Sequence, residues 1–180
     1  ETHTGVMNTN RDRFAMEVFT DKTKVPDLGT LAFDNHTFAT NDFRDLAYKE
    51  SNTTLFAASY GAGLQISANN GATWANINTG DGLPSNNITS VFVDRQDDLW
   101  VGSSDSGVGT SNDNGTSWTN YSTTEGLVSN NVSDIFVDRS GTIYVATDIG
   151  LSISANSGAT WASYDSTNGI ATNAINDIYV

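Results

Sequence analysis

The stretch Ser67-Ala68-Asn69-Asn70-Gly71-Ala72-Thr73-Trp74 occurs twice more in similar form, at Ser111–Trp118 and at Ser154–Trp161. The three tryptophans lie 44 and then 43 residues apart. Self-similarity at a period of about 40–45 residues is typical of a repeat array such as a β-propeller. Residues that recur in every repeat are therefore expected to be structural, and a specific function is expected where the repeats differ.

Each repeat begins with an apolar segment that predicts a strand. Residues 86–94 match residues 130–138, and related segments begin at Asn41 and at Asn173. The run Val91-Phe92-Val93 has no polar face, which is typical of a strand covered on both sides. Two further strands are expected before each Ser-to-Trp stretch, and a fourth follows each tryptophan. Four short antiparallel strands in each period predict one propeller blade.

The sequence thus predicts an all-β fold, a partial β-propeller of about three and a half four-stranded antiparallel blades. The repeats are expected at residues 41–85, 86–129 and 130–172, with the start of a fourth at 173–180. Residues 1–40 do not match the repeat. Strands expected at 16–19 and 30–33 would make this segment the outer strands of a preceding or closing blade. A parallel β-helix is the main structural alternative, but it would need shorter rungs.

The predicted blades do not close a ring, because propellers have about 4–8 blades. Either the chain is part of a longer protein, or another copy or a partner completes the ring. Unpaired strand edges promote aggregation. We therefore expect residues 175–180 to pair with strands outside their own repeat, with residues 1–40 as candidates.

Composition limits the partners. The chain has 21 acidic and 8 basic residues, a net charge of −13, which disfavours nucleic acid and anionic membranes as partners. It has no cysteine and no apolar run near the ~20 residues that span a bilayer, so no membrane insertion is expected. Because the chain begins at Glu1 and not at Met, we expect a processed or trimmed product, for which loss of a leader is one explanation. The expected location is secreted, cell-surface or periplasmic.

The Ser-to-Trp stretch predicts the hairpin turn between the third and fourth strands. Its Asn or Asp can accept hydrogen bonds from backbone N–H groups, its Gly can adopt a positive φ, and its Trp offers a large apolar face. The residues assigned to this structural role are Ser67, Asn69, Gly71, Trp74, Ser111, Asp113, Gly115, Trp118, Ser154, Asn156, Gly158 and Trp161.

These turns resemble the Asp-box, or bacterial neuraminidase repeat, of sialidases, xyloglucanases, sortilin-type receptors and photosystem assembly propellers. The rest of the unit, from Gly82-Leu83-Pro84-Ser85-Asn86 to Trp100-Val101-Gly102-Ser103, resembles the two-component-regulator propeller repeat. Gly126-Leu127-Val128-Ser129-Asn130 begins a second match. The resemblance covers about residues 41–180 and implies the fold. It implies no single function, because these repeats occur in enzymes, receptors and scaffolds.

The resemblance also implies where a ligand would bind. The Asp-box lies opposite the usual ligand face, so its Asn and Asp residues are expected to be turn residues. Ligands of such propellers meet the loops that enter the first strand and the loops between the second and third strands, where Tyr60, Asp105 and Asp148 lie. The candidate ligand-binding residues are Asp42, Arg44, Asp45, Asn87, Asn131, Asp134, Asn176 and Asp177, with Thr89 and Ser133 beside them.

Three of these candidates, Asp45, Asp134 and Asp177, share one repeat position, at which the second blade has Ser90. They would form a polar, acidic funnel that binds sugar hydroxyls or a cation. The alternative is that the candidates cap strand starts and line a wet central channel.

No catalytic residues are predicted. A glycosidase needs two carboxylates roughly 5–10 Å apart, and only repeat geometry would bring Asp134 and Asp177 together. A sialidase also needs an arginine cluster, yet Arg95 and Arg139 occupy the same turn in two repeats, which indicates a structural role. No metal site and no cofactor are expected, because the two histidines are isolated and cysteine is lacking.

Three functions fit these patterns. The first is a non-catalytic extracellular or periplasmic propeller that recognises a glycan or protein ligand as a module of a larger surface or sensor protein. The second is a fragment of a sialidase- or xyloglucanase-like glycoside hydrolase, which a strongly raised carboxylate pKa facing a deep cleft would favour. The third is a structural adhesin or spacer module without a cleft.

Overall fold

The structure is a computed structural model that describes residues 42–170 and 174–179 of the 180-residue chain. The described residues belong to one compact unit, Phe33–Val180. Within them, no helix is long and apolar enough to cross a membrane. The strands expected at 16–19 and 30–33 lie outside the described residues.

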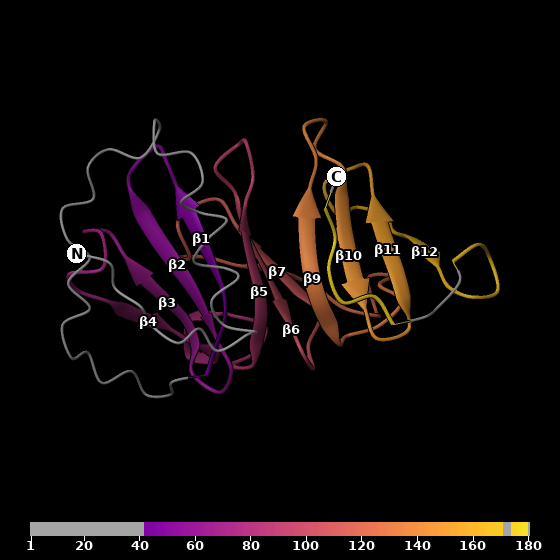
Figure 1. Ribbon diagram of the computed structural model, residues 1–180, viewed down its shortest axis with the longest axis horizontal. Helices are drawn as coiled ribbons and strands as arrows, with labels where there is room; N and C mark the ends of the chain where they lie inside the picture. The colour runs from indigo at the N-terminus through magenta and orange to yellow at the C-terminus, as the bar shows by residue number, and fades with distance from the viewer. Residues whose placement is uncertain (1–41, 171–173, 180) are drawn as a thin grey trace, which may run out of the picture. The chain divides into compact units, whose positions relative to one another are not determined.

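Three four-stranded antiparallel sheets follow one another along the chain (Figure 1). Blade 1 contains β1 (Phe43–Lys49), β2 (Thr54–Ser59), β3 (Gly63–Ser67) and β4 (Ala75–Ile77); blade 2 contains β5 (Ile88–Val93), β6 (Leu99–Ser103), β7 (Val108–Ser111) and β8 (Thr119–Tyr121); blade 3 contains β9 (Val132–Val137), β10 (Ile143–Thr147), β11 (Gly150–Ser154) and β12 (Ala162–Tyr164). In each sheet, strands that are neighbours in sequence are hydrogen-bonded neighbours. The predicted all-β fold with four-stranded antiparallel propeller blades is confirmed.

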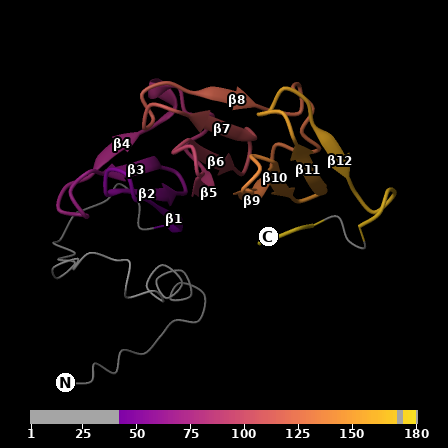
Figure 2. The same cartoon turned by 90° about the horizontal axis from the view of Figure 1, so that it is seen from above.

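The sheets pack face to face through their first strands. β5 packs against both β1 and β9, and Figure 2 shows these inner strands at one side of the sheets and the outer strands β4, β8 and β12 at the other. On β6, Leu99 and Val101 join the core shared with blade 1, whereas Trp100 joins the core shared with blade 3. Because both faces of the central strands are buried, they carry apolar runs and not a one-sided alternation.

The Ser-to-Trp turns use the same backbone hydrogen bonds in all three blades. In blade 2, Asp113 Oδ1 accepts from Ser117 N at 2.8 Å, and Ser111 Oγ accepts from Gly115 N at 2.7 Å. The equivalent two bonds occur in blades 1 and 3. Each turn is therefore held in shape by hydrogen bonds from its own side chains.

Two of the turn glycines allow neighbouring blades to approach closely. Gly115 and Gly158 have φ angles of +86° and +83°. A Cβ on Gly115 would lie 2.6 Å from Ile77 Cδ1, and a Cβ on Gly158 would lie 2.5 Å from Tyr121 Cζ. Because Ile77 and Tyr121 end the outer strands of the preceding blades, the turn of each of these blades is seated on the outer strand before it.

A buried lysine joins blades 1 and 2 at the same end. Lys49 is the last residue of β1 and is 7% exposed. Its Nζ donates to Asp97 O at 2.9 Å and to Asn114 Oδ1 at 3.0 Å, both in turns of blade 2. These two charge-assisted bonds offset part of the cost of burying the ammonium group.

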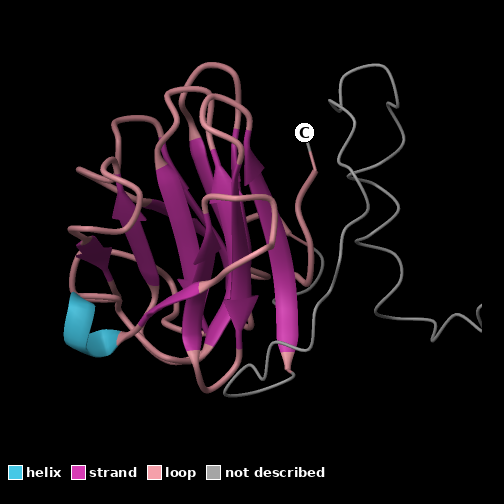
Figure 3. Cartoon of the chain, turned by 90° about the vertical axis from the view of Figure 1, so that its left-hand side faces the viewer, coloured by secondary structure: helices cyan, strands magenta, loops and turns pink. Residues whose placement is uncertain are grey.

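The loops that lead from one blade to the next are also repeated. Within the described residues the helical turn η1 (Thr79–Asp81) lies in the first of them (Figure 3). Asn78 Oδ1 accepts from Gly80 N at 2.7 Å, and Asp81 Oδ2 accepts from Asn78 N at 3.0 Å, which together form a capping box. Ser122 and Glu125 make the equivalent bonds in the next loop. These caps fix the chain where it enters the inner strands.

Candidate functional site

One position of the inner strands links successive blades through bonds from the backbone to a side chain. The three pairs are Asp45 Oδ2 with Val91 N (2.8 Å), Ser90 Oγ with Ile135 N (3.3 Å) and Asp134 Oδ2 with Ile178 N (2.9 Å). In each pair the side chain of one blade accepts from the inner strand of the next. The shared repeat position therefore fixes the register between blades.

Hydroxyl groups one residue earlier make a second set of bonds between blades. Thr89 Oγ1 donates to Val132 O at 2.7 Å, and Ser133 Oγ donates to Ile175 O. Ile175 N in turn donates to Thr147 O at 3.1 Å. The segment 174–179 is therefore seated on blade 3 in the position of a fourth inner strand.

Residues 175–180 were expected to pair with strands outside their own repeat. Ile175 and Ile178 do bond outside their own repeat, to blade 3. No strand ladder includes them in the described part of the chain, and pairing with residues 1–40 lies outside the described residues.

The structure brings Asp45, Ser90, Asp134 and Asp177 together, and we call these four residues the axial cluster. Ser90 Oγ lies 2.9 Å from Asp134 Oδ1 and 3.3 Å from Asp45 Oδ2. Its single hydroxyl proton can serve only one of the two carboxylates at a time. Asp177 joins them from the segment 174–179, where it raises the pKa of both Asp134 and Asp45. Three acidic candidates from the sequence therefore converge.

Burial dominates the electrostatics of the axial cluster. Burial raises the pKa of Asp45. Hydrogen bonds from Val91 N, Leu46 N and Ser90 lower this pKa, and the charge of Asp177 makes a smaller contribution that raises it. Burial raises the pKa of Asp134 to about 6 and Asp177 adds to this increase, while the bonds from Ile178 N, Ser90 and Ile135 N oppose it. Asp134 therefore holds a proton at higher pH than an isolated aspartate.

This arrangement differs from a glycosidase pair. Two catalytic carboxyls lie about 5 Å or more apart, with the glycosidic bond between them. The Asp134 carboxyl instead accepts the backbone N–H groups of Ile135 and Ile178. The raised pKa of Asp134 thus has a structural cause, which is burial of its carboxyl between the blades.

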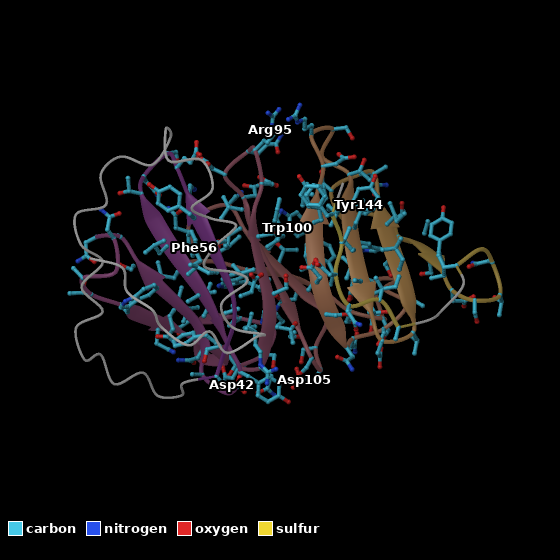
Figure 4. The ribbon with its side chains drawn as sticks, in the orientation of Figure 1. Asp42, Phe56, Arg95, Trp100, Asp105 and Tyr144 are labelled. Atoms are coloured by element: carbon cyan, nitrogen blue, oxygen red, sulfur yellow. The ribbon has the colours of Figure 1, made fainter. Side chains whose placement is uncertain are left out.

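Within blade 2 and within blade 3, an asparagine–aspartate pair joins two loops of the same blade. Both pairs lie at the end of the blades where Figure 4 shows Asp42 and Asp105. Asn87 Nδ2 donates to Asp105 Oδ2 at 3.0 Å. Asn131 Nδ2 donates to Asp148 Oδ2 at 3.2 Å, the repeat-equivalent bond. The candidates Asn87 and Asn131 are therefore engaged in loop contacts, whereas Asn176 is exposed.

Blade 1 departs from this pattern. Arg44 Nη2 bonds to Asp42 Oδ2 at 2.8 Å, and Arg44 Cζ lies 4.9 Å from the centre of the Tyr60 ring. We call Asp42, Arg44 and Tyr60 the blade 1 cluster. The Arg44 side chain is 46% exposed and Tyr60 is 40% exposed. A guanidinium, a carboxylate and an aromatic ring are thus presented to solvent where the other blades carry closed Asn–Asp pairs.

Among the described residues, Arg44 is the one lysine or arginine at its end of the blades. The remaining basic residues of the described chain, Lys49, Arg95 and Arg139, all lie at that opposite end, in or beside the turns between the first and second strands. Figure 4 shows Arg95 there, far from Asp42 and Asp105. In the part of the chain that is described, no three His, Cys, Asp or Glu side chains are arranged to hold a metal ion.

Sequence reasoning named every acidic member of these clusters, but it missed two connections. Ser90 looked like a simple exception to the Asp position, whereas its hydroxyl joins two carboxylates across blades. The stacking of Arg44 on Tyr60 also has no local signal, because it needs the pairing that brings the start of β1 beside the end of β2.

The family model described as the two-component regulator propeller matches residues 82–105 and 126–148, less than half of the chain. Both matched segments begin at the Gly-Leu of an inter-blade loop and end between the second and third strands. This supports the two-component-regulator part of the resemblance. The resemblance of the Ser-to-Trp turns to the Asp-box stays a prediction. No relative was found among curated proteins.

Several solved structures share the fold. The extracellular domain of a hybrid two-component system from B. thetaiotaomicron is 20% identical, with a TM-score of 0.68 over 79% of this chain and 19% of that one. PorZ, a surface component of the type-IX secretion system of Porphyromonas gingivalis, is 16% identical, with a TM-score of 0.54 over 76% and 23%. A GH74 enzyme of Niastella koreensis is 18% identical, with a TM-score of 0.51 over 67% and 22%.

These similarities establish the propeller fold and leave the activity open. The chain spans about a fifth of the length of the solved proteins it matches. Those proteins include a sensor domain, a secretion component and an enzyme, and a shared fold does not transfer any of these activities.

Proposed function

We propose that this chain is a ligand-recognition portion of an extracellular β-propeller, part of a larger surface or sensor protein. The observation that carries the proposal is the blade 1 cluster. At a position where blades 2 and 3 close their loops with Asn–Asp pairs, blade 1 exposes Arg44 and Tyr60. Exposed polar and aromatic residues on loops held by a rigid scaffold are typical of binding surfaces.

The chemistry of the cluster favours a glycan over other small ligands. A guanidinium and a carboxylate can make paired hydrogen bonds with vicinal sugar hydroxyls, and the face of Tyr60 can cover apolar C–H groups. A protein ligand that presents similar polar groups is the alternative. Likeness to an extracellular sensor domain and to a bacterial surface component supports a location outside the cytoplasm.

The test is binding of the 180-residue chain to an immobilised panel of neutral and uronic-acid-containing oligosaccharides. We expect at least one glycan to be retained, with affinity reduced about tenfold or more in Arg44→Ala and in Tyr60→Ala, since a lost bidentate or stacking contact is worth about 1–3 kcal/mol. Arg95→Ala and Arg139→Ala are matched controls at the opposite end. Binding that is lost in these controls and kept in Arg44→Ala would contradict the proposed face.

A second candidate is a fragment of a glycoside hydrolase propeller. The raised pKa of Asp134, at about 6, and the likeness to a GH74 enzyme favour it. The bonds that the Asp134 carboxyl accepts from Ile135 N and Ile178 N argue against it. Incubating the chain with xyloglucan and with sialosides should release no reducing sugar. Release that is abolished by Asp134→Asn would favour the hydrolase instead.

We also propose that further blades complete the ring, either from other chain segments or from another copy. Three blades and one seated inner strand are fewer than the about 4–8 blades of a closed propeller. Solution mass measurements should separate these cases, because assembly by copies gives a defined oligomer and completion by other segments does not.

A further inference from the structure

One face of blade 3 is apolar and partly exposed. The same face is covered in blades 1 and 2, where the equivalent residues belong to the cores between blades and are at most 5% exposed. These residues are Phe56, Leu64 and Leu83 for blade 1, and Trp100, Val108 and Leu127 for blade 2. The equivalent residues of blade 3, Tyr144, Leu151 and Ile170, are all only half-buried. Blade 3 therefore carries one half of a further core between blades.

The outer strand of blade 3 shows the same difference. Ile77 and Tyr121, on the outer strands of blades 1 and 2, receive the turn glycines Gly115 and Gly158 of the next blade. Strand pairing places Tyr164 of β12 at the same position. Its side chain is 40% exposed. Tyr164 is thus placed to receive the turn glycine of a further blade.

The glycine of the loop after each blade gives a third, independent sign. A Cβ on Gly82 or on Gly126 would lie 3.6 Å from the tryptophan of the next blade, Trp118 or Trp161. Gly169 is their equivalent after blade 3. In the described part of the chain, a Cβ on Gly169 would meet nothing within 4 Å. The loop after blade 3 therefore has the backbone that elsewhere lies against a tryptophan.

The segment 174–179 already supplies half of the expected cover. The face of blade 2 is covered by two apolar residues on the first strand of blade 3 and two on its second strand, namely Val132, Ile135, Ile143 and Val145. Ile175 and Ile178 stand at the repeat positions of the first two. The cover that remains is a second strand with two apolar residues in alternation.

A second copy of this chain would compete with the segment for its seat. Blade 1 of a second copy brings its own inner strand, with Phe43 and Leu46 at the repeat positions of Ile175 and Ile178. Those positions are filled, because Ile175 N donates to Thr147 O at 3.1 Å and Ile178 N donates to the Asp134 carboxyl at 2.9 Å. A blade that uses 174–179 as its own inner strand covers the face without displacing the segment.

We propose that this face of blade 3 receives the remaining three strands of a fourth blade, of which the segment 174–179 is the inner strand. The partner has a defined chemistry: two alternating apolar residues on its first added strand, a turn glycine against Tyr164 and a tryptophan against Gly169. This rests on the proposal that further blades complete the ring and does not depend on the proposed ligand face.

The first test compares two equivalent leucines in the full 180-residue chain. Leu64→Ala and Leu151→Ala delete the same atoms at the same repeat position, but Leu64 is 0% exposed and Leu151 is half-buried. Because the cost of such a deletion follows burial, Leu64→Ala should shift the urea midpoint about threefold more than Leu151→Ala. Equal shifts would mean that the face of blade 3 is already covered, which would overturn the proposal.

The second test supplies the strands. Val180 stands at the repeat position of Val137, so a second copy of residues 138–172 joined after Val180 completes a fourth blade. Amide exchange measured by NMR should show the Ile178 amide protected about tenfold or more, and Leu151→Ala should become as costly as Leu64→Ala. Added strands that fold but change neither quantity would overturn the proposal.

A matched control places one methyl group in the added blade. Gly158→Ala in the appended copy would bring a Cβ against Tyr164, as the same change in blade 3 would bring one to 2.5 Å from the Tyr121 ring. This variant should lose the added protection of Ile178. If it keeps that protection in full, the added turn is not seated on Tyr164 and the proposed fit is wrong.

A concentration series on the 180-residue chain tests the competing occupant. Amide protection in β12 and at Ile178 should not change with concentration. If protection in β12 rises with concentration while Ile178 loses protection, a second copy takes the seat and the proposal is overturned. These measurements read blade 3 and not glycan retention, so they succeed or fail separately from the proposed ligand face.

Discussion

The two ends of the blades differ in how strictly their side-chain contacts are repeated. At one end, the Ser-to-Trp turns repeat the same bonds in blades 1, 2 and 3 and are seated on the outer strand of the preceding blade. At the other end, blades 2 and 3 share an asparagine–aspartate bond between their loops. Blade 1 instead carries Asp42, Arg44 and Tyr60, whose side chains are exposed to solvent. The turn end is constrained by side chains packed between blades. At the loop end the blades are joined by backbone bonds, such as Gly61 N to Asn86 O, so the side chains there can vary without breaking these bonds.

The largest effect should come from closing the space at the turn end. Gly158→Ala would place a Cβ 2.5 Å from the Tyr121 ring at a φ of +83°. Overpacking and the positive φ together should lower the free energy of unfolding by about 2–4 kcal/mol, measured by urea denaturation.

Gly141 provides a matched control for this variant. Its φ is +85°, but a Cβ there would meet nothing within 4 Å. Gly141→Ala should therefore show only the cost of the backbone conformation, about 1 kcal/mol. Equal losses in the two variants would mean that close approach between blades does not constrain the turn end.

Loss of the lysine that joins blades 1 and 2 should have the next largest effect. Lys49→Met keeps most of the buried stem but removes the bonds to Asp97 O and Asn114 Oδ1. Because hydrogen bonds to charged groups are worth about 1.5–3 kcal/mol and the ammonium no longer has to be buried, we expect a net loss of about 1–2 kcal/mol. Arg95→Met, at an exposed turn nearby, should change stability by less than about 0.5 kcal/mol.

The contrast between the ends also explains what the sequence could predict. Strands and hairpin turns were predictable because their signals are local, such as the run Val91-Phe92-Val93 and the spacing from Asn69 to Trp74. The axial cluster was predictable as a repeat position but not as a bonded group, since the Ser90 contacts depend on how three blades pack. The same limit applies to Arg44 and Tyr60, which meet only after β1 and β2 pair.

The loop end should tolerate change with little loss of stability. Arg44→Ala removes an ion pair whose side chains are 46% and 42% exposed, and such pairs contribute about 0–1 kcal/mol. We expect the free energy of unfolding to fall by no more than about 1 kcal/mol, even though this residue is central to the proposed ligand face. A loss as large as that of Gly158→Ala would show that the loop end is as constrained as the turn end.

The smallest expected effect is a pH-dependent change in stability at the blade 2 turn, where Asp113 stands in place of the asparagines of the other two turns. Hydrogen bonds from the Ser117 side chain, Ser117 N and the Ser111 side chain lower the pKa of Asp113 to about 2. A carboxyl with a lowered pKa adds stability above its unfolded value, near pH 4, and loses it as the pH falls toward 2. Asp113→Asn should therefore be slightly less stable than the natural chain at pH 7, and thermal unfolding should show this difference shrinking as the pH falls from about 4 through about 2.

Blade 1 offers the reverse of this substitution. Asn69 occupies the position of Asp113, with Thr73 in place of Ser117. Because the Thr73 hydroxyl can turn to donate to a carboxylate, Asn69→Asp should add the same pH-dependent increment that Asp113→Asn removes. The stability gained by Asn69→Asp should equal the stability lost by Asp113→Asn at each pH between 2 and 7. If the two differ, the turns of blades 1 and 2 share their backbone bonds but not the energetics of their side chains.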